Sequence, residues 1–338
     1  MSAPQETDVA IIGAGPVGLF AVFECGMLRL RTHVFDTLDM IGGQCAALYP
    51  EKPIYDIPGH AAIDGAGLVD RLAEQIAPFH PVFHLGQQVT GLKPLDGGGF
   101  ELTGDKGTVL RAKAVILAAG AGAFGPNRPP LDGIEAYEGK SVFYLVRRRE
   151  ELRGRRVVIA GGGDSAVDWA IALADIAAQV KLVHRRPKFR AAPETAARLA
   201  ELAQAGKIEL VVPYQLSGLD GEAGLLDAVE VADLDGGTRR LEADVLLAFF
   251  GLSMQLGPIA EWGLDLEFHH VPVDPATMAT NIPGLFAIGD LATYPGKLKL
   301  ILTGFAEAAL AAHAAHPLVR PGEALHFEYS TSKGVAGL

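Results

Sequence analysis

Two glycine-rich turns carry the clearest chemical signal in the sequence. Residues 13–18 read GAGPVG and residues 161–166 read GGGDSA. The first two glycines of such a turn allow a tight bend and a close backbone approach to a pyrophosphate, and the small last residue lets helix and strand pack closely. The following helix offers free N–H groups and a positive dipole end to the phosphates. The candidate nucleotide-binding residues are Gly13, Gly15, Pro16 and Gly18 in the first turn, and Gly161, Gly163 and Ser165 in the second.

The elements that must position these turns repeat along the chain. A predicted strand at residues 8–12 leads into the first turn, a helix follows over 16–28, and a second strand at 32–35 ends at Asp36. The second copy has a strand at 156–160, a helix to about residue 175 and a strand at 179–183 that ends at His184. The last residue follows the first glycine by 23 positions in both copies. Two such units with the same spacing predict two Rossmann-like nucleotide-binding domains.

The two copies differ at the end of the second strand. Asp36 places a carboxylate there, which can accept hydrogen bonds from ribose hydroxyls and would repel a phosphate. The first unit is therefore predicted to hold the adenosine of FAD or NAD. The second copy ends with a cluster in which arginines can bind a 2′-phosphate bidentately, which predicts NADPH. A solvated surface turn is the alternative for this cluster, whose candidate ligands are His184, Arg185, Arg186 and Arg190.

Composition limits the classes of protein that fit. The 338 residues suggest two domains, and 49% hydrophobic against 20% charged residues is enough to build a core. A net charge of −11 argues against nucleic-acid binding. We find no signal-peptide pattern and no apolar run of the ~18 residues that a membrane span needs. The sequence therefore predicts a soluble, cytoplasmic α/β enzyme without a metal site.

Longer motifs make the sequence resemble one family. Residues 42–59 (GGQCAALYPEKPIYDIPG), 118–126, 161–170, 250–253 and 294–308 together resemble the ferredoxin–NADP⁺ reductases of the thioredoxin-reductase-like type. The resemblance implies an FAD domain, made of residues 1–122 and 283–338, that is split by an inserted NADPH domain of residues 123–282. Each domain would have the three-layer ββα architecture. The resemblance also implies a homodimer.

The resemblance implies further FAD contacts. Gln44 would bond the flavin edge, Tyr49 would stack on the isoalloxazine, Val89 would meet the adenine through its backbone, and Phe124 would lie near the flavin. Asp290 would accept a hydrogen bond from the ribityl chain, although it could also cap the following segment.

The C-terminal tail is a further element of this resemblance. It places Tyr329 over the flavin of the other subunit and bonds Thr331 to FAD. A frayed terminus is the alternative reading of these residues.

The cysteines exclude a dithiol relay. Cys45 has Pro50 five residues later, where one class of disulfide reductase has its second cysteine, and residues 139–156 contain no C-x-x-C. The flavin would therefore pass electrons directly to an acceptor, which the resemblance implies is ferredoxin or flavodoxin. A reductase of small acceptors such as quinones, and a non-catalytic redox sensor, remain as alternatives.

A basic segment suggests where an acidic partner could dock. Residues 140–200 hold 13 Lys/Arg and 6 Asp/Glu, against a net charge of −11 for the whole chain. Its densest part is the run Arg147, Arg148, Arg149, Arg153, Arg155 and Arg156, which could steer an acidic ferredoxin or could simply be a solvated loop.

Overall fold

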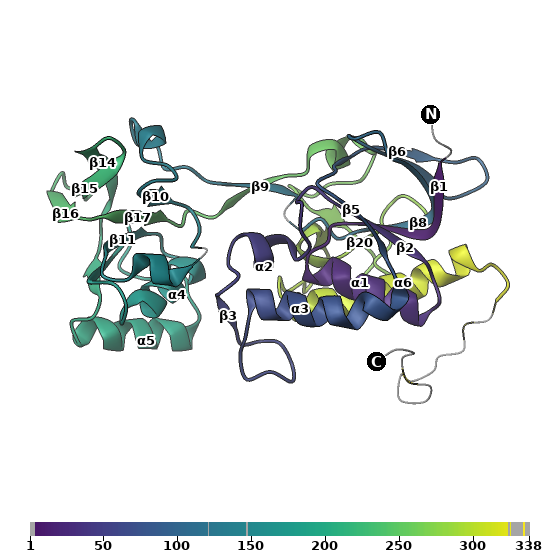
Figure 1. Ribbon diagram of the computed structural model, residues 1–338, viewed down its shortest axis with the longest axis horizontal. Coiled ribbons are helices and arrows are strands. Elements are labelled where there is room, and N and C mark those ends of the chain that lie inside the picture. The colour runs from purple at the N-terminus through teal and green to yellow at the C-terminus, as the bar shows by residue number, and fades with distance from the viewer. Residues whose placement is uncertain (1–3, 121, 147, 324, 326–333, 335–338) are drawn as a thin grey trace. The chain divides into compact units, whose positions relative to one another are not determined.

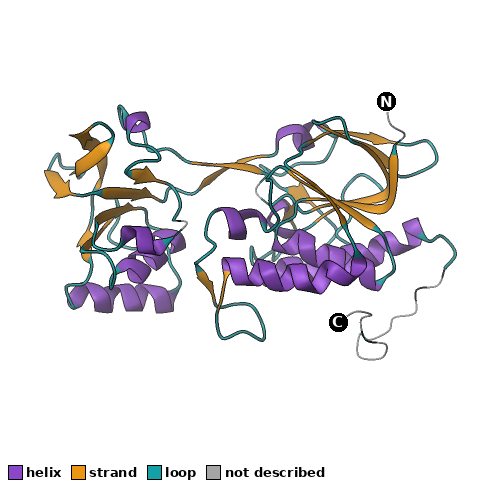
Figure 2. Cartoon of the chain, viewed as in Figure 1, coloured by secondary structure: helices purple, strands orange, loops and turns teal. Residues whose placement is uncertain are grey.

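The chain forms two compact units. The computed structural model describes residues 4–120, 122–146, 148–323, 325 and 334, with side chains for all of these except 123–126 and 252–254. One unit contains Met1–Phe124 with Met254–Leu338, and the other contains Gly125–Ser253. The two connections between them are strands that pair with each other, β9 (Ala123–Pro126) and β18 (Leu252–Gln255). Figures 1 and 2 show the elements along the chain.

The first unit is built on a sheet in which parallel strands end at one edge. β1 (Gln5–Ile12) lies between β2 (Thr32–Asp36) and β8 (Val109–Leu117), and Ile12 is in register with both Phe35 and Leu117. β5 (Val82–Leu85) and β20 (Leu285–Ala287) extend this sheet in parallel. The carboxyl ends of these strands therefore meet, as they do where α/β proteins bind ligands. The antiparallel strands β6 (Val89–Pro94) and β7 (Phe100–Gly104) continue from β8.

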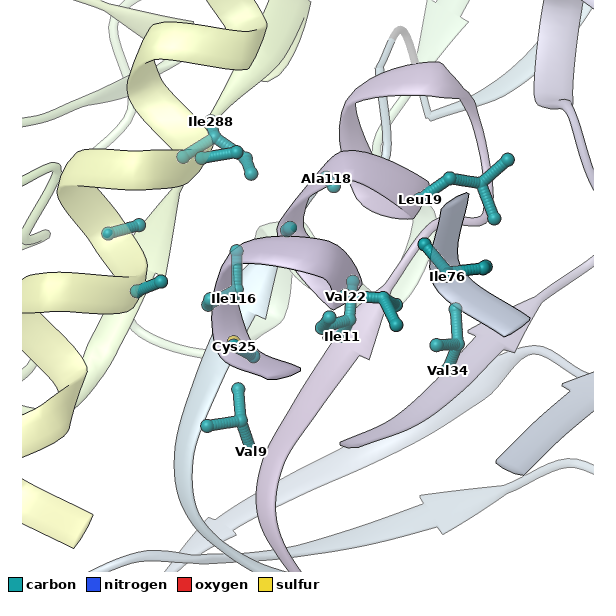
Figure 3. Packing of buried hydrophobic residues seen from close by; sticks show 14 of the residues in the cluster. Val9, Ile11, Leu19, Val22, Cys25, Val34, Ile76, Ile116, Ala118 and Ile288 are labelled. Carbon is teal, nitrogen blue, oxygen red and sulfur yellow. The ribbon is translucent and has the colours of Figure 1, made fainter. Parts of the chain in front are cut away.

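Alternating residues of β1 and β2 separate two cores. Val9, Ile11 and Val34 face the helices α1 (Pro16–Met27), α3 (Gly65–Ile76) and α6 (Ile301–Val319), as Figure 3 shows for residues of α1 and the strands. Ala10 and Phe35 face a second cluster that includes residues of β6 and β7. This alternation is the period-2 pattern of a strand buried on both faces, so the unit has three layers.

The second unit repeats these layers. Its parallel sheet has the order β10 (Val142–Phe143), β17 (Val245–Ala248), β11 (Arg156–Ala160), β12 (Gln179–Val183) and β13 (Glu209–Val211). The helices α4 (Asp164–Leu173) and α5 (Pro193–Gln204) pack in one cluster, and β14 (Gln215–Glu222), β15 (Leu225–Ala232) and β16 (Thr238–Glu242) contribute to another. The strands β11 and β12 have the bounds that the sequence predicts.

Shorter elements complete the chain. In the first unit they are α2 (Gly43–Ala47), β3 (Pro53–Ile54), β4 (Ile63–Asp64), η1 (Ala77–Phe79), η4 (Gly257–Glu261), β19 (Val271–Pro272), η5 (Gly289–Leu291) and β21 (Ala292–Thr293). In the second unit they are η2 (Ile134–Ala136) and η3 (Arg149–Leu152). Within the described ranges, no helix is both long and apolar enough to cross a membrane.

The chain returns to the first unit at Met254 and not at residue 283, the boundary expected from the sequence. The structure groups residues 254–282 with the first unit. Leu256, Ile259, Leu264 and Val271 are buried in one cluster with Val89 of β6, and this burial fixes the segment there. The segment has little regular secondary structure, so its sequence pattern gives no sign of where it packs.

The first glycine turn depends on very close backbone packing. Gly13 has φ +113°, and a Cβ on it would lie 2.2 Å from the Ala118 carbonyl oxygen. A Cβ on Gly18 would lie 1.9 Å from the Gly13 carbonyl oxygen. Any side chain at either position would push α1 away from the ends of β1 and β8.

Gly18→Ala should therefore destabilise the first unit. Because the obstacle is backbone, we expect the free energy of unfolding to fall by about 1–3 kcal/mol, as for other overpacked sites. Chemical denaturation of the purified variant measures this change. Gly97→Ala is the control, since a Cβ there meets nothing within 4 Å. Equal stability of the two variants would contradict the packing described.

Candidate functional site

A cavity of about 270 Å³ opens at the carboxyl ends of the first unit's parallel strands. It is lined by both glycine-turn and loop residues of the same unit. The residues predicted from the sequence that line it are Gly13, Gly15, Pro16, Asp36, Gln44, Tyr49, Val89 and Asp290. The wall of one cavity therefore contains predicted residues that are far apart in the sequence, from Gly13 directly after β1 to Asp290 in η5.

Two facing glycine backbones form one part of the cavity wall. Gly15 caps α1 without any side-chain hydrogen bond, and Pro16 begins the helix. A Cβ on Gly43 would lie 2.9 Å from the Gly15 Cα, so α2 approaches the turn very closely. The first-turn N–H groups of α1 have no side-chain cap, which suits a pyrophosphate.

Asp36 is fixed by backbone donors at the end of β2. Its Oδ2 accepts from Ala14 N–H at 2.6 Å and its Oδ1 from Leu38 N–H at 2.8 Å. Burial raises the pKa of Asp36, and these hydrogen bonds oppose the rise. A carboxylate held at this place can accept from a ribose, and it disfavours a phosphate, as the sequence predicts.

Tyr49 and Cys45 form a polar contact in the wall of the cavity. The Cys45 Sγ lies 3.7 Å from the Tyr49 Oη. Burial raises the pKa of the Cys45 thiol to about 11, and burial also raises the pKa of Tyr49. Both groups are therefore protonated at neutral pH. Cys25, the second cysteine, is also buried and free, so neither cysteine forms a disulfide.

The sequence does not predict several of the residues that line the cavity. They lie directly after β2, directly before β6, and at the start of α6, and they are Thr37, Leu38, Gln87, Gln88, Lys299, Leu300 and Ile301. The position of Thr37 and Leu38 after Asp36 was a usable signal. The other five become neighbours of the turn only through the tertiary fold.

Gly18 stands apart from this cavity, and three other predicted residues lie partly or wholly outside the described part of the chain. Gly18 does not line it and instead packs behind the turn against Gly13. Phe124 belongs to β9, but its side chain lies outside the described residues, as do Tyr329 and Thr331 entirely. Their predicted contacts with FAD stay predictions.

The second glycine turn joins β11 to α4. Gly161 has φ +156°, and a Cβ on it would lie 2.6 Å from the Phe249 carbonyl oxygen. Gly163 caps α4, and Ser165 lies in the first turn of that helix. The Arg190 N–H donates to the Gly162 carbonyl at 2.7 Å, which brings the arginine segment against the turn.

The basic residues at the end of β12 surround this second turn. Arg185, Arg186 and Arg190 are exposed. His184 is half-buried, and its ring lies 5.4 Å from that of Phe189. Burial and the nearby arginines lower the pKa of His184, so its ring is neutral at pH 7. Exposed guanidinium groups beside a helix start can bind a phosphate from solution.

The basic run before β11 is partly neutralised. Arg153 pairs with Glu150 at 2.8 Å, and Arg156 pairs with Asp244 at 2.6 Å and Glu242 at 3.0 Å. Arg149 lies 3.9 Å from Glu150. Arg147 lies outside the described residues.

Comparison with known proteins defines the class. The model of the pyridine nucleotide-disulphide oxidoreductase family matches residues 7–315. The chain therefore belongs to the pyridine nucleotide-disulphide oxidoreductase family. A curated relative from Paramagnetospirillum magneticum, named ferredoxin–NADP reductase, is 64% identical over 98% of this chain and 99% of its own. One of the same name from Acidiphilium cryptum is 67% identical over 100% and 99%. These relatives confirm the resemblance drawn from the sequence.

Solved structures confirm the predicted fold class. The thioredoxin reductase of T. acidophilum matches with a TM-score of 0.81 at 23% identity, covering 92% of this chain and 98% of its own. The thioredoxin reductase of Lactococcus lactis matches with a TM-score of 0.81 at 25% identity, covering 93% and 99%. The chain has a thioredoxin-reductase-like α/β fold.

Replacing Arg185 and Arg186 by alanine tests the second nucleotide site. If they bind a 2′-phosphate, the KM for NADPH should rise about tenfold or more, because charged hydrogen bonds of this kind contribute about 1.5–3 kcal/mol each. The KM for NADH, which lacks the phosphate, should change little. Steady-state kinetics with both nucleotides measures this. Equal increases would contradict the assignment.

Proposed function

We propose that this protein is a flavoenzyme that transfers electrons between NADPH and ferredoxin or flavodoxin through FAD. One observation carries the proposal. The two strand–turn–helix–strand units share one architecture but carry opposite charges at the end of the second strand. The first has a fixed carboxylate at Asp36, and the second has exposed guanidinium groups at Arg185 and Arg186. The name ferredoxin–NADP reductase, shared by relatives that match nearly the whole chain, supports the choice of substrates.

The residues that line the cavity of the first unit suit FAD. Gly15, where a Cβ would meet only the Gly43 Cα at 3.9 Å, leaves room for the pyrophosphate, and Asp36 would hold the ribose hydroxyls. Tyr49, Gln44 and Asp290 line the same cavity and would bind the flavin part. When bound, FAD can take up a hydride and release electrons singly. The protein's part is to orient the nucleotide and to exclude water around it.

The second unit would hold NADPH. The N-terminus of α4 would bind the pyrophosphate, and the arginines at the end of β12 would bind the 2′-phosphate. Hydride transfer needs alignment of two rings rather than an acid–base pair, so the proposal assigns no catalytic side chain.

The two cysteines favour direct electron transfer from the flavin to a separate acceptor. Cys45 borders the FAD cavity, but its pKa is raised to about 11 and it forms no disulfide. Cys25 is buried elsewhere in the same unit. A protein dithiol therefore has no second sulfur beside the flavin site, and the electrons would leave for a separate one-electron carrier.

The remaining parts of the proposal concern assembly and place. We infer a homodimer that works in the cytoplasm, with an acidic ferredoxin steered by part of the basic run. Arg148 and Arg155 are its exposed members for which the described residues provide no ion pair. Because Arg153 and Arg156 are already ion-paired, Arg148 and Arg155 are the better candidates for contact with a partner.

NADPH-driven reduction of cytochrome c, with and without ferredoxin, tests the proposal. We expect strong stimulation by ferredoxin that weakens as salt is raised, because charged encounter is screened. Fast reduction of quinones without any stimulation would favour a reductase of small acceptors. Binding of both nucleotides without turnover would favour a redox sensor.

Reversing the charge of Arg148 and Arg155 to glutamate should weaken this coupling selectively. We expect the KM for ferredoxin to rise about tenfold at low salt and less at high salt, since rim charges act mainly on encounter. Turnover with ferricyanide should persist. Arg198→Glu is the matched control, an exposed arginine on α5 of the same unit. An equal loss with ferricyanide would assign these arginines to structure or to NADPH binding.

A further inference from the structure

The buried residues of α6 include one acidic residue among mostly small ones. Glu307 is 1% exposed, and the other buried residues of α6 are Gly304, Ala308, Ala311, Ala312, Ala315, His316 and Val319. An ionised carboxylate in such surroundings is costly unless it is paired and fully hydrogen-bonded. A glutamate at this position therefore needs donors from a neighbouring segment.

Those donors all come from the loop that precedes α6. Glu307 Oε2 accepts from the Gly289 N–H at 2.7 Å. Its Oε1 accepts from the Tyr294 hydroxyl at 2.6 Å and from the Lys297 ammonium. The Lys297 side chain is only 6% exposed, so the ion pair is buried as well. Both carboxylate oxygens are thus satisfied, and the charge is balanced.

This loop forms part of the cavity wall at both of its ends. Gly289 and Asp290 line the cavity at its start, and Lys299, Leu300 and Ile301 line it at its end. Gly289 has φ +69°, and its N–H is held by Glu307. The orientation of this peptide group sets the position of the next residue, Asp290.

We propose that Glu307 is a positioning residue for the cofactor, because its hydrogen bond to Gly289 N–H holds the loop 289–301 in the shape that binds FAD. The inference rests on the proposed function, since it takes FAD as the ligand of this cavity. Glu307 does not line the cavity and acts through Gly289 and Asp290. Lys297 serves to neutralise the carboxylate in its buried place.

Two charge-balanced double variants separate the hydrogen bond from the ion pair. Lys297→Met with Glu307→Gln keeps an acceptor for the Gly289 N–H, whereas Lys297→Met with Glu307→Leu removes it. The dissociation constant of FAD for the apoprotein, measured from flavin fluorescence, should stay within about threefold of wild type in the first. In the second it should rise about tenfold or more, as expected when a buried donor loses its partner.

The controls distinguish positioning from general stability. Glu74→Gln removes an exposed ion pair from α3 of the same unit and should leave the FAD affinity unchanged. Equal FAD affinity of the two double variants would overturn the inference. If the leucine variant does not fold, hydrogen exchange decides, because the Gly289 amide of the wild-type apoprotein must then be protected. An unprotected amide would also overturn it.

The result also separates this inference from the function on which it rests. If the wild-type apoprotein binds no FAD, the proposed function fails. If it binds FAD and both double variants bind it equally well, only the role of Glu307 fails.

Discussion

The close contact between the β1–α1 turn and the end of β8 is the constraint on which the first unit depends. Gly13 meets the backbone of Ala118, and Gly18 meets the backbone of Gly13, at distances that exclude any Cβ. This contact lets α1 begin at the edge where β1, β2 and β8 end in register. The helix start, the Asp36 carboxylate and the cavity lie at one edge for this reason.

The second unit has the same architecture but carries positive instead of negative charge after its second strand. β11, the glycine turn and α4 correspond to β1, the first turn and α1, and Gly161 again approaches backbone closely. The difference lies in a few side chains after the second strand, where Asp36 has its counterpart in His184 and the arginines that follow. One architecture can thus hold two different dinucleotides, of which only NADPH carries a 2′-phosphate, because the distinguishing groups lie outside the packed core.

Much of this was predictable because it depends on local sequence. The strands β11 and β12, the start of α1 and the positions of Gly13, Gly15 and Asp36 follow from short-range pattern and turn chemistry. Gln44, Tyr49 and Val89 were named only through family resemblance, since nothing local distinguishes them from core residues. Gln87, Lys299 and Ile301 were missed because they reach the cavity through tertiary packing alone. The segment 254–282 was placed differently for the same reason, as its burial beside β6 is a long-range contact. Glu307 did leave a local sign, a charge within an alanine-rich helical face, whose meaning needed the loop partners.

We infer that the flavin is the single redox centre of this chain and passes electrons to a separate carrier. An anaerobic titration of the FAD-loaded protein with NADPH, followed by visible absorption, tests it most directly. We expect one equivalent of NADPH per flavin to bleach the spectrum fully and no further equivalent to be consumed. Uptake of a second equivalent would reveal another two-electron acceptor in the chain, such as a reducible disulfide, and the flavin would then not be the single redox centre.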